Sequence, residues 1–305
     1  MVNSRTMQWC TLRRWPHRDL TGTQVNLPVM YNPSNTFRTM NKISKLAYVD
    51  PMAKLGDNIT IEPFVFIEGN VEIGDNCHIR PNAVIRSGAR IGKNNIIHEG
   101  AIISANPQDF RWKGDDSFVI IGDNNTIREH VIINRSIHPD GATRIGSNSF
   151  IMAQTHIGHD SQIGDYCVLG NAVKIAGDVK IADYSILSSN ALVHEGCDVG
   201  EMCLIKGGCR VNSHVPPFVI MAHNPIEYKG INSYVLRKCG KSEKTIDDIA
   251  SAYRHLYGSA TSVFNAMRRI KVDVDDSQEK QQILKFIEDH DLTLAAIPKD
   301  LTSED

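Results

Sequence analysis

The chain has 305 residues, 22% of them charged, and a formal net charge of −2 at pH 7. Charge this close to balance gives no bulk positive field for nucleic acid, and no apolar stretch reaches the roughly 20 residues of a membrane-spanning helix. The length exceeds that of a typical single domain, so we expect one elongated domain with an additional segment.

Residues 1–41 show no repeat and contain scattered arginine, tryptophan and proline. They lack the compact apolar stretch of about 7–15 residues that marks a signal peptide. We therefore expect an N-terminal extension that is disordered, or a start assigned upstream of Met40.

Between residues 42 and 215, isoleucine, leucine or valine recurs at every sixth position, in a frame that runs from Leu55 to Val211. A mostly small residue stands two positions before each of them. A period of six fits neither a helix nor a plain alternating strand, and short hexapeptide units bury a core only by stacking. A β-sandwich would not produce an unbroken frame of six. The pattern predicts an all-β solenoid, a parallel β-helix with three hexads in each triangular coil.

Two stretches break this frame, residues 105–118 and residues 136–142. The first is rich in charged and aromatic side chains, and both interrupt an otherwise regular repeat. Insertions into a solenoid map to one face, which is often the binding face. We expect both stretches to be loops that border a functional site.

Most of the cysteines follow the repeat. Five of the seven occupy the small-residue position of the hexad, namely Cys77, Cys167, Cys197, Cys203 and Cys209. This placement indicates core filling, and neither metal ligation nor disulfide pairing. A reducing, cytoplasmic compartment is the matching expectation.

The segment IMAQTHIGHD places His156 one position before and His159 two positions after the frame residue Ile157. Both histidines should therefore point outward from the core. Residues eighteen apart lie one coil higher, so His159, Gly177 and Glu195 should form a column with steps of about 4.8 Å. Neutral imidazole is a usual general base, and a nearby N–H suits a developing oxyanion; a surface histidine beside a turn glycine is the alternative.

Helical periodicity replaces the hexads over residues 216–305, which predicts a C-terminal α-helical domain. Thr245 is the expected cap of a first helix that ends at Gly258, and further helices are expected near 261–270 and 277–290. Basic residues precede or open this domain: Lys229, Arg237, Lys238, Lys241 and Lys244. Such a cluster is either a dock for an acidic partner or a solvated face.

The motifs NPQDFRWKG, IGDNNTIRE, HIGHD, KIAGDVKI, LVHEG and VPPFVIMAHNP, followed by GINSYVLRKCG, together resemble the UDP-N-acetylglucosamine O-acyltransferases that begin lipid A biosynthesis. The resemblance spans about residues 40–260. It implies a left-handed β-helix, a hand that the period alone does not fix. It also implies a homotrimer with active sites between subunits, and transfer of a 3-hydroxyacyl chain from acyl carrier protein to the glucosamine 3-hydroxyl, without metal or cofactor.

The resemblance also implies roles for individual residues. His159 matches the general base, Asp160 the carboxylate that orients it, and Gly177 the glycine whose amide polarises the thioester carbonyl. Positions matching substrate-binding residues are Asp109, Arg111, His156, His194, Glu195, Asn232 and Lys238. Acyl carrier proteins are acidic, so the basic cluster is a candidate dock for the donor.

Gly207 matches a position that sets acyl-chain length in relatives. Like His159, it stands two residues after a frame isoleucine. The 48 residues between the two amount to about 2.7 coils, or roughly 13 Å along the axis. We therefore expect a long acyl chain to lie along the solenoid between these two residues.

Several positions depart from the family pattern: Arg111 replaces a frequent Lys, Asn134 and Asp178 replace His, Glu195 replaces Gln, and Lys238–Cys239 replaces two Arg. These departures leave two alternatives open, an amino-sugar acceptor and a non-catalytic paralogue that binds acyl carrier protein or nucleotide sugar. A zinc γ-type carbonic anhydrase shares the solenoid and would use His156, His159 and His194. The ligand spacing of that family is absent.

Overall fold

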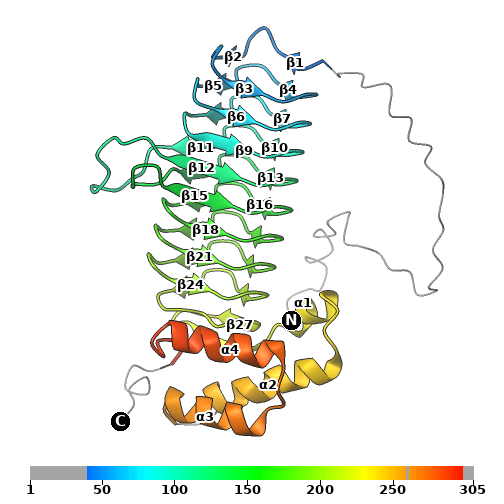
Figure 1. The fold of residues 1–305 in the computed structure, drawn as a ribbon, viewed down its shortest axis with the longest axis vertical. Helices are drawn as coiled ribbons and strands as arrows, with labels where there is room; N and C mark the ends of the chain where they lie inside the picture. The colour runs from blue at the N-terminus through cyan, green and yellow to red at the C-terminus, as the bar shows by residue number, and fades with distance from the viewer. Residues whose placement is uncertain (1–39, 259–260, 298–305) are drawn as a thin grey trace, which may run out of the picture. The chain divides into compact units, whose positions relative to one another are not determined.

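The computed structural model describes residues 40–258 and 261–297. The prediction for residues 1–41 concerns a segment that lies almost wholly outside these ranges. Within them the chain forms three sheets, named A, B and C below, and then four helices (Figure 1). None of the helices in this described part is both long enough and apolar enough to cross a membrane.

The strands are short, and the chain visits the three sheets in rotation. Sheet A contains β1 (Lys42–Ile43), β4 (Thr60–Ile61), β7 (His78–Ile79), β10 (Ile96–Ile97), β13 (Thr126–Ile127), β16 (Phe150–Ile151), β19 (Val168–Leu169), β22 (Ile186–Leu187), β25 (Leu204–Ile205), β27 (Val219–Ala222) and β28 (Glu227–Ile231). Sheet B contains β2 (Tyr48–Val49), β5 (Phe66–Ile67), β8 (Val84–Ile85), β11 (Ile102–Ala105), β14 (Ile132–Asn134), β17 (His156–Ile157), β20 (Lys174–Ile175), β23 (Leu192–Val193) and β26 (Arg210–Val211). Sheet C contains β3 (Lys54–Leu55), β6 (Glu72–Ile73), β9 (Ala89–Ile91), β12 (Phe118–Ile121), β15 (Ala142–Ile145), β18 (Gln162–Ile163), β21 (Lys180–Ile181) and β24 (Asp198–Val199).

Strand register confirms the predicted coil of eighteen residues. In sheet B, Ile157 pairs with Ile175, and Ile175 pairs with Val193, in parallel. All three side chains are fully buried. Each coil therefore stacks its frame residues directly on those of the coil below, and these stacks form the solenoid core.

The corners of the coil use left-handed backbone. The residue three positions after a frame isoleucine has a positive φ, for example 60° at Asn82, 61° at Asp160 and 56° at Asp178. Asn and Asp adopt this conformation more readily than other residues with a side chain. Polar side chains are thereby fixed at the corners, where they are available for chemistry.

The cysteines of the hexad fill the core as predicted. Cys77, Cys167, Cys197, Cys203 and Cys209 are buried free thiols. Burial raises the pKa of Cys167 and of Cys203 to about 12. Both thiols therefore stay protonated and unreactive at neutral pH.

Two loops interrupt the coils where the sequence predicts them. Loop 1, residues 106–117, joins β11 to β12, and loop 2, residues 135–141, joins β14 to β15. Both leave sheet B at the corner before sheet C, in consecutive coils, because β11 pairs with β14. Figure 1 shows them projecting from the same side of the stack.

The β-structure continues beyond the predicted boundary at residue 216. β27 pairs in parallel with β25, and β28 then pairs antiparallel with β27. The helical part consists of α1 (Ser233–Lys238), α2 (Glu243–Tyr257), α3 (Val263–Asp273) and α4 (Gln278–Asp289). The last two strands lack the hexad frame, so the repeat in the sequence ends before sheet A does.

Three of the four helices were predicted. The cap of α2 is Ser242, whose hydroxyl accepts a hydrogen bond from the Thr245 N–H, so the predicted cap at Thr245 was one turn too late. The predicted end at Gly258 is confirmed. The six-residue α1 was missed, because it is too short to show helical periodicity.

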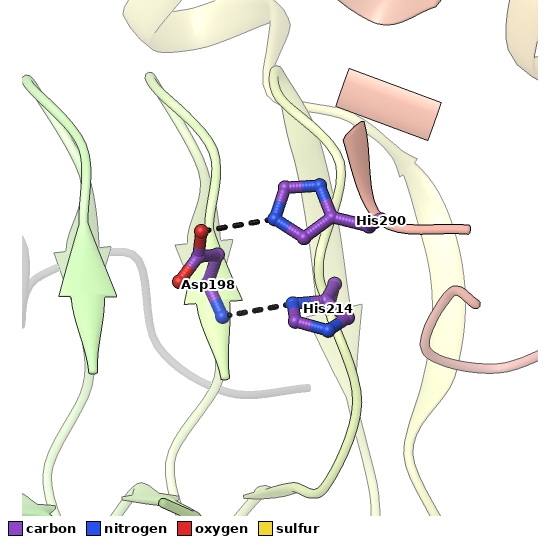
Figure 2. A group of neighbouring side chains, drawn as sticks. All are labelled: Asp198, His214 and His290. Carbon is purple, nitrogen blue, oxygen red and sulfur yellow. Dashed lines mark hydrogen bonds and ion pairs between the residues drawn. The ribbon is translucent and has the colours of Figure 1, made fainter. Parts of the chain in front are cut away.

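A cluster of three side chains joins the last coil to the C-terminal segment (Figure 2). Nε2 of His290, at the end of α4, lies 2.9 Å from the carboxylate of Asp198 on β24. The Asp198 N–H donates to Nδ1 of His214 at 3.2 Å, and His214 forms a β-bridge with Leu294. Val215 pairs with Val199 of β24, and the C-terminal segment pairs with His214 in turn, so the edge of sheet C at β24 does not expose unpaired backbone.

Candidate active site

His159 follows β17 at the corner where the chain turns from sheet B to sheet C. Its Nδ1 lies 2.9 Å from Oδ2 of Asp160. An ionised carboxylate only accepts hydrogen bonds, so this contact assigns the proton of the neutral imidazole to Nδ1. Nε2 then carries the free lone pair that a general base requires.

The side chain of His159 leaves the apolar interior as predicted, yet it is only 7% exposed. Loop 1 covers it, since Oδ2 of Asp109 lies 3.4 Å from Nε2. A repeat frame gives the direction of a side chain but does not show where an inserted loop folds back. The covering makes the site drier than an open corner.

Asp160 is fixed from four directions. Its N–H donates to Oγ1 of Thr143 at 2.8 Å, Oδ1 accepts from the Ser136 hydroxyl, and Oδ2 accepts from the Ile137 N–H at 3.1 Å. Burial pushes the pKa of this carboxyl up, but the hydrogen bonds, with that of His159, outweigh burial and lower the pKa overall. Asp160 is therefore an ionised and oriented partner for the imidazole.

The sequence analysis missed Ser136, Ile137 and Thr143. Loop 2 supplies the first two, and its position at a suspected binding face was the only available signal. Hydrogen bonds within an irregular loop depend on how it closes, and spacing does not show this.

Gly177 lies one coil above His159, where the Asp178 N–H donates to the His159 carbonyl at 3.0 Å. The glycine is buried, and a side-chain carbon at Gly177 would collide with the imidazole ring. Among the described residues, no acceptor takes a hydrogen bond from the Gly177 N–H. The amide is therefore available to a ligand beside the imidazole.

Glu195 lies one further coil above, since the Gly196 N–H donates to the Gly177 carbonyl at 3.2 Å. The predicted column of His159, Gly177 and Glu195 is thereby confirmed. Because both histidine and glutamate lie at the same corner, a single loop is able to span them.

Loop 1 spans this column through Arg111. The guanidinium donates to the carboxylate of Asp109 at 3.0 and 2.8 Å and to Oε1 of Glu195 at 2.6 Å. Hydrogen bonding to Arg111 holds the pKa of Asp109 well below its usual range. The arrangement places two carboxylates and one permanent cation over the imidazole.

The other histidines of this corner differ in exposure. His156 is half-buried on the outer face of β17, and burial, reinforced by Lys174, lowers the pKa of its imidazole. His194 is exposed and directly precedes Glu195. Both are neighbours of the column, as predicted.

Two predicted substrate residues lie elsewhere. Asn232 is 2% exposed, and its amide donates to the carbonyl of Met202 at 2.8 Å. Lys238 is exposed at the end of α1, with its ammonium 5.9 Å from the Tyr234 ring centroid. Within the described part of one chain, neither belongs to the hydrogen-bonded group around His159.

Most of the basic cluster is neutralised by acidic neighbours. The pairs are Lys229 with Glu227, Arg237 with Glu243, Lys241 with Glu279, and Lys244 with Asp248 and Asp275. Paired cations present little net field to an acidic protein, so these contacts favour a structural function for four of the five residues.

Gly207 follows β25 at the corner between sheets A and B, whereas His159 lies between sheets B and C. The 48 residues that separate them make eight hexads, two full coils and two further corners. Only separations divisible by eighteen keep a residue on one corner. An acyl chain that runs from His159 to Gly207 would therefore have to cross to a different corner of the coil if both residues came from one subunit.

A hollow of about 450 Å³ adjoins Gly207. Its lining consists of Lys206, Gly207, Ile220, Ala222, His223 and Lys229. This hollow lies at the end of the β-helix, beside β27 and β28, the last two strands of sheet A.

Two groups of side chains in the described residues bring three possible metal-ligand atoms together: Asp198, His214 and His290, and separately His98, Glu99 and Glu129. In the first group Nδ1 of His214 already accepts a hydrogen bond from the Asp198 N–H, so this nitrogen is occupied and not available to a metal ion. His156, His159 and His194, the ligands of a carbonic anhydrase, do not form such a group within the described part of one chain.

Comparisons with known proteins show which family the chain resembles. A family model described as UDP-N-acetylglucosamine O-acyltransferase, domain 2, matches residues 214–294, and the bacterial transferase hexapeptide model matches residues 52–87 and 142–177. An acyl-[acyl-carrier-protein]–UDP-N-acetylglucosamine O-acyltransferase of Aliarcobacter butzleri is 36% identical over 81% of this chain and 95% of the relative. One from Halorhodospira halophila is 37% identical over 82% and 97%.

Solved structures are also similar. The UDP-N-acetylglucosamine acyltransferase of Bacteroides fragilis is 44% identical, with a TM-score of 0.81 over 84% of this chain and 100% of that one. That of Francisella novicida is 37% identical, with a TM-score of 0.78 over 81% and 91%.

The stacked hexads and the oriented histidine define a hexapeptide-repeat acyltransferase. The relatives, at 36–44% identity over most of the chain, identify one family within this class. The chain belongs to the family of UDP-N-acetylglucosamine O-acyltransferases. The left-handed winding of the β-helix, which the motifs implied, is confirmed with it.

Proposed function

We propose that this acyltransferase moves a 3-hydroxyacyl chain from acyl carrier protein to the 3-hydroxyl of UDP-N-acetylglucosamine, the step that begins lipid A biosynthesis. The observation that carries the proposal is the contact of His159 Nδ1 with Asp160, which assigns the lone pair to Nε2 on the side of the ring facing Gly177 and Asp109. Both substrates are those named for the acyltransferase of Aliarcobacter butzleri, which is similar to this chain.

In the proposed reaction, Nε2 of His159 removes the proton of the sugar hydroxyl as the oxygen attacks the thioester carbonyl. The Gly177 N–H then donates to the tetrahedral oxyanion. Collapse of the intermediate breaks the carbon–sulfur bond, and the imidazolium returns its proton to the departing pantetheine thiolate. Asp160 stabilises the imidazolium that forms in between.

The acceptor sugar is expected between loop 1 and β17, where Asp109, Arg111 and His156 offer hydrogen-bonding groups. His194 and Glu195 extend this surface by one coil toward the nucleotide. Asn232 and Lys238 belong to the proposal only as contributions from a neighbouring subunit. Arg111 and Glu195 differ from the family's frequent Lys and Gln, which keeps an amino-sugar acceptor as the alternative.

A homotrimer is part of the proposal, and the outer faces of the sheets support it. The outward residues of sheet C are mostly polar: Lys54, Glu72, Arg90, Ile120, Arg144, Gln162, Lys180 and Asp198. Those of sheet A are apolar in the later coils except for Thr126: Ile96, Phe150, Val168, Ile186, Leu204 and Ile220. An apolar stripe across consecutive coils is suited to bury against another copy of the chain.

The trimer is tested by placing a charge on this stripe. Ile186→Glu should lower the mass measured by sedimentation from three chains toward one, because an unpaired charge is costly in an apolar interface. Gln162→Glu, at the outer face of sheet C, is the matched control and should remain trimeric. An Ile186→Glu protein that stays trimeric would move the interface away from sheet A.

The activity is tested with UDP-N-acetylglucosamine and a panel of 3-hydroxyacyl carrier proteins, with the product identified by mass. His159→Ala should lower kcat by about 10²–10⁴-fold, and His156→Ala should be milder because its proposed function is positioning. His255→Ala, on α2 and 3.5 Å from Asp273, is the control. His159→Ala activity within threefold of wild type would contradict the assignment of the base.

The same assay separates the remaining alternatives. Turnover with a 3-amino analogue and not with UDP-N-acetylglucosamine would assign the other acceptor. Binding of either substrate without turnover would indicate the non-catalytic paralogue. A cytoplasmic location follows from the proposed donor and is tested by fractionating cells that express the full chain.

A further inference from the structure

Ser136 of loop 2 is fully buried beside Asp160. Its Oγ accepts a hydrogen bond from the His138 N–H at 2.9 Å. The hydroxyl proton is then donated to Oδ1 of Asp160, which lies closer than its other acceptor, the His138 carbonyl at 3.4 Å. The hydroxyl thus receives one hydrogen bond and gives one.

The backbone of Ser136 is also fixed. Its carbonyl accepts from the Ser117 hydroxyl at 2.6 Å, which ties the end of loop 1 to loop 2. Gly141 leaves room for the Ser136 hydroxyl, because a side-chain carbon at Gly141 would collide with it. The side chain of Ser136 is therefore held in one place, with its hydroxyl hydrogen directed toward Asp160.

This hydrogen bond acts on the carboxylate oxygen that His159 does not use. Oδ2 of Asp160 accepts from His159 and from the Ile137 N–H, so Ser136 is the donor that fixes the remaining oxygen. A carboxylate bonded at both oxygens has no freedom to rotate about its final bond. Its orientation in turn fixes the imidazole plane.

We propose that Ser136 is a positioning residue for the acyl transfer, the first member of a hydrogen-bonded chain Ser136–Asp160–His159. This inference rests on the proposed function of His159. Ser136 contacts neither substrate in the proposal and acts only through Asp160. Without its hydroxyl, the carboxylate of Asp160 is held only at Oδ2, by the Ile137 N–H and by His159, and it orients the imidazole less firmly.

Ser136→Ala should lower kcat on the order of 10- to 100-fold, the effect of one hydrogen bond to a charged group. KM for the nucleotide sugar should change by less than about threefold, because an Ala there removes no proposed substrate contact. The decisive measurement repeats the change in an Asp160→Ala background. There Ser136→Ala should have no further effect, since residues that act as one unit are not additive.

Ser185→Ala is the matched control. Ser185 is fully buried, donates to the Gly200 carbonyl at 2.8 Å and accepts from the Cys203 N–H at 3.3 Å, so the variant loses equivalent hydrogen bonds. It should lower the thermal midpoint without lowering kcat. An equal loss of kcat in Ser185→Ala would assign the effect of Ser136→Ala to general destabilisation.

A second readout does not depend on turnover. Proton NMR of protein with labelled histidine should show the hydrogen-bonded Nδ1–H of His159 in wild type and in Ser185→Ala, and its loss in Ser136→Ala. The inference is overturned by an unchanged Nδ1–H signal, or by a Ser136→Ala effect of the same size with and without Asp160. An inactive wild type that keeps the NMR difference would contradict the proposed function and leave the positioning chain intact.

Discussion

Gly177 faces the imidazole ring of His159 so closely that a side chain at Gly177 would collide with the ring. The three nearest atoms that such a side chain would meet all belong to the imidazole ring of His159. This contact explains why residue 177 has no side chain. Backbone conformation does not require a glycine there, since Gly177 has no positive φ.

Gly177→Ala should therefore displace the imidazole without unfolding the coil. A displacement of about 1 Å of a catalytic group is worth roughly 10²-fold in rate, and kcat in the acyl-transfer assay is the measurement. Gly69→Ala is the control, because its new carbon would meet the Asp50 carboxylate at 3.0 Å and the Met52 side chain at 3.4 Å, and no imidazole. Full activity of Gly177→Ala would show that the ring has room to move.

The contact between Gly177 and His159 shows what the sequence was able to predict. Both residues lie in the periodic part of the chain, where counting by eighteen along the sequence is enough to place them in adjacent coils. The same count fixes Ile157 and Ile175 as stacked core residues. Where every coil repeats the last, sequence separation is equivalent to spatial position.

Prediction failed where the period stops. The bond from Ser136 to Asp160 depends on the closure of loop 2, and the cap of α2 lies at Ser242 because two good capping residues stand one turn apart. Gly207 lies at a corner, but not at the corner of His159, because the distance along the axis was counted and the rotation around it was not.

The pairing of Arg111 with Glu195 yields a prediction about the family's departures. Arg111→Lys should raise KM for UDP-N-acetylglucosamine about 3- to 10-fold, because a lysine cannot donate to both oxygens of Asp109. Arg111→Lys combined with Glu195→Gln restores the pair common in relatives and should be less impaired than Arg111→Lys alone. Steady-state kinetics of the two single variants and the double variant provide the check, and additive losses would contradict coupling.

The same pair should matter little for stability. Both side chains are 54% exposed, and exposed ion pairs contribute about 1 kcal/mol or less. Glu195→Gln should therefore change the free energy of unfolding in urea by less than about 1 kcal/mol. A larger change would mean that loop 1 supports the fold as well as covering His159.

Acid should weaken the cluster that joins the last coil to the C-terminal segment. Burial lowers the pKa of His214, and the neighbouring His290 and Lys180 lower it further. Asp198 raises it, but by less. The unfolded chain then binds the proton more tightly, so stability is complete above the ordinary pKa of about 6.5 and falls as the pH drops below it. Protonation at Nδ1 of His214 also removes the acceptor of the Asp198 N–H.

The thermal midpoint of wild type should decrease as the pH is lowered from 7 to 5.5. We expect this cluster to account for roughly 2–4 °C of the decrease, the shift that about 1 kcal/mol causes in a chain of this size. His214→Asn keeps an acceptor for the Asp198 N–H and does not titrate, so it should reduce that slope. His255→Asn is the control and should leave it unchanged. Equal slopes in all three proteins would show that His214 stays neutral throughout this range.

Gly207 lies on a different corner from His159, so any function in measuring the acyl chain requires the two residues to come from different subunits. Gly207→Met should then fill the hollow lined by Ile220 and Ala222 and shift preference toward shorter donors. The ratio of kcat/KM for long and short 3-hydroxyacyl carrier proteins measures this. If glycine serves only the local turn, stability falls and the ratio stays the same.

Mixed trimers test whether Gly207 limits the length of an acyl chain bound at the His159 of a neighbouring subunit. Coexpression of His159→Ala chains with Gly207→Met chains gives trimers in which every intact histidine belongs to a chain that carries Met at position 207. If both residues of a site came from one chain, each active site would prefer short donors. If the site is shared, an intact His159 faces Gly207 of a neighbouring His159→Ala chain, and activity on long donors should reappear in the mixture. Its absence in mixtures that retain short-donor activity would contradict a shared site.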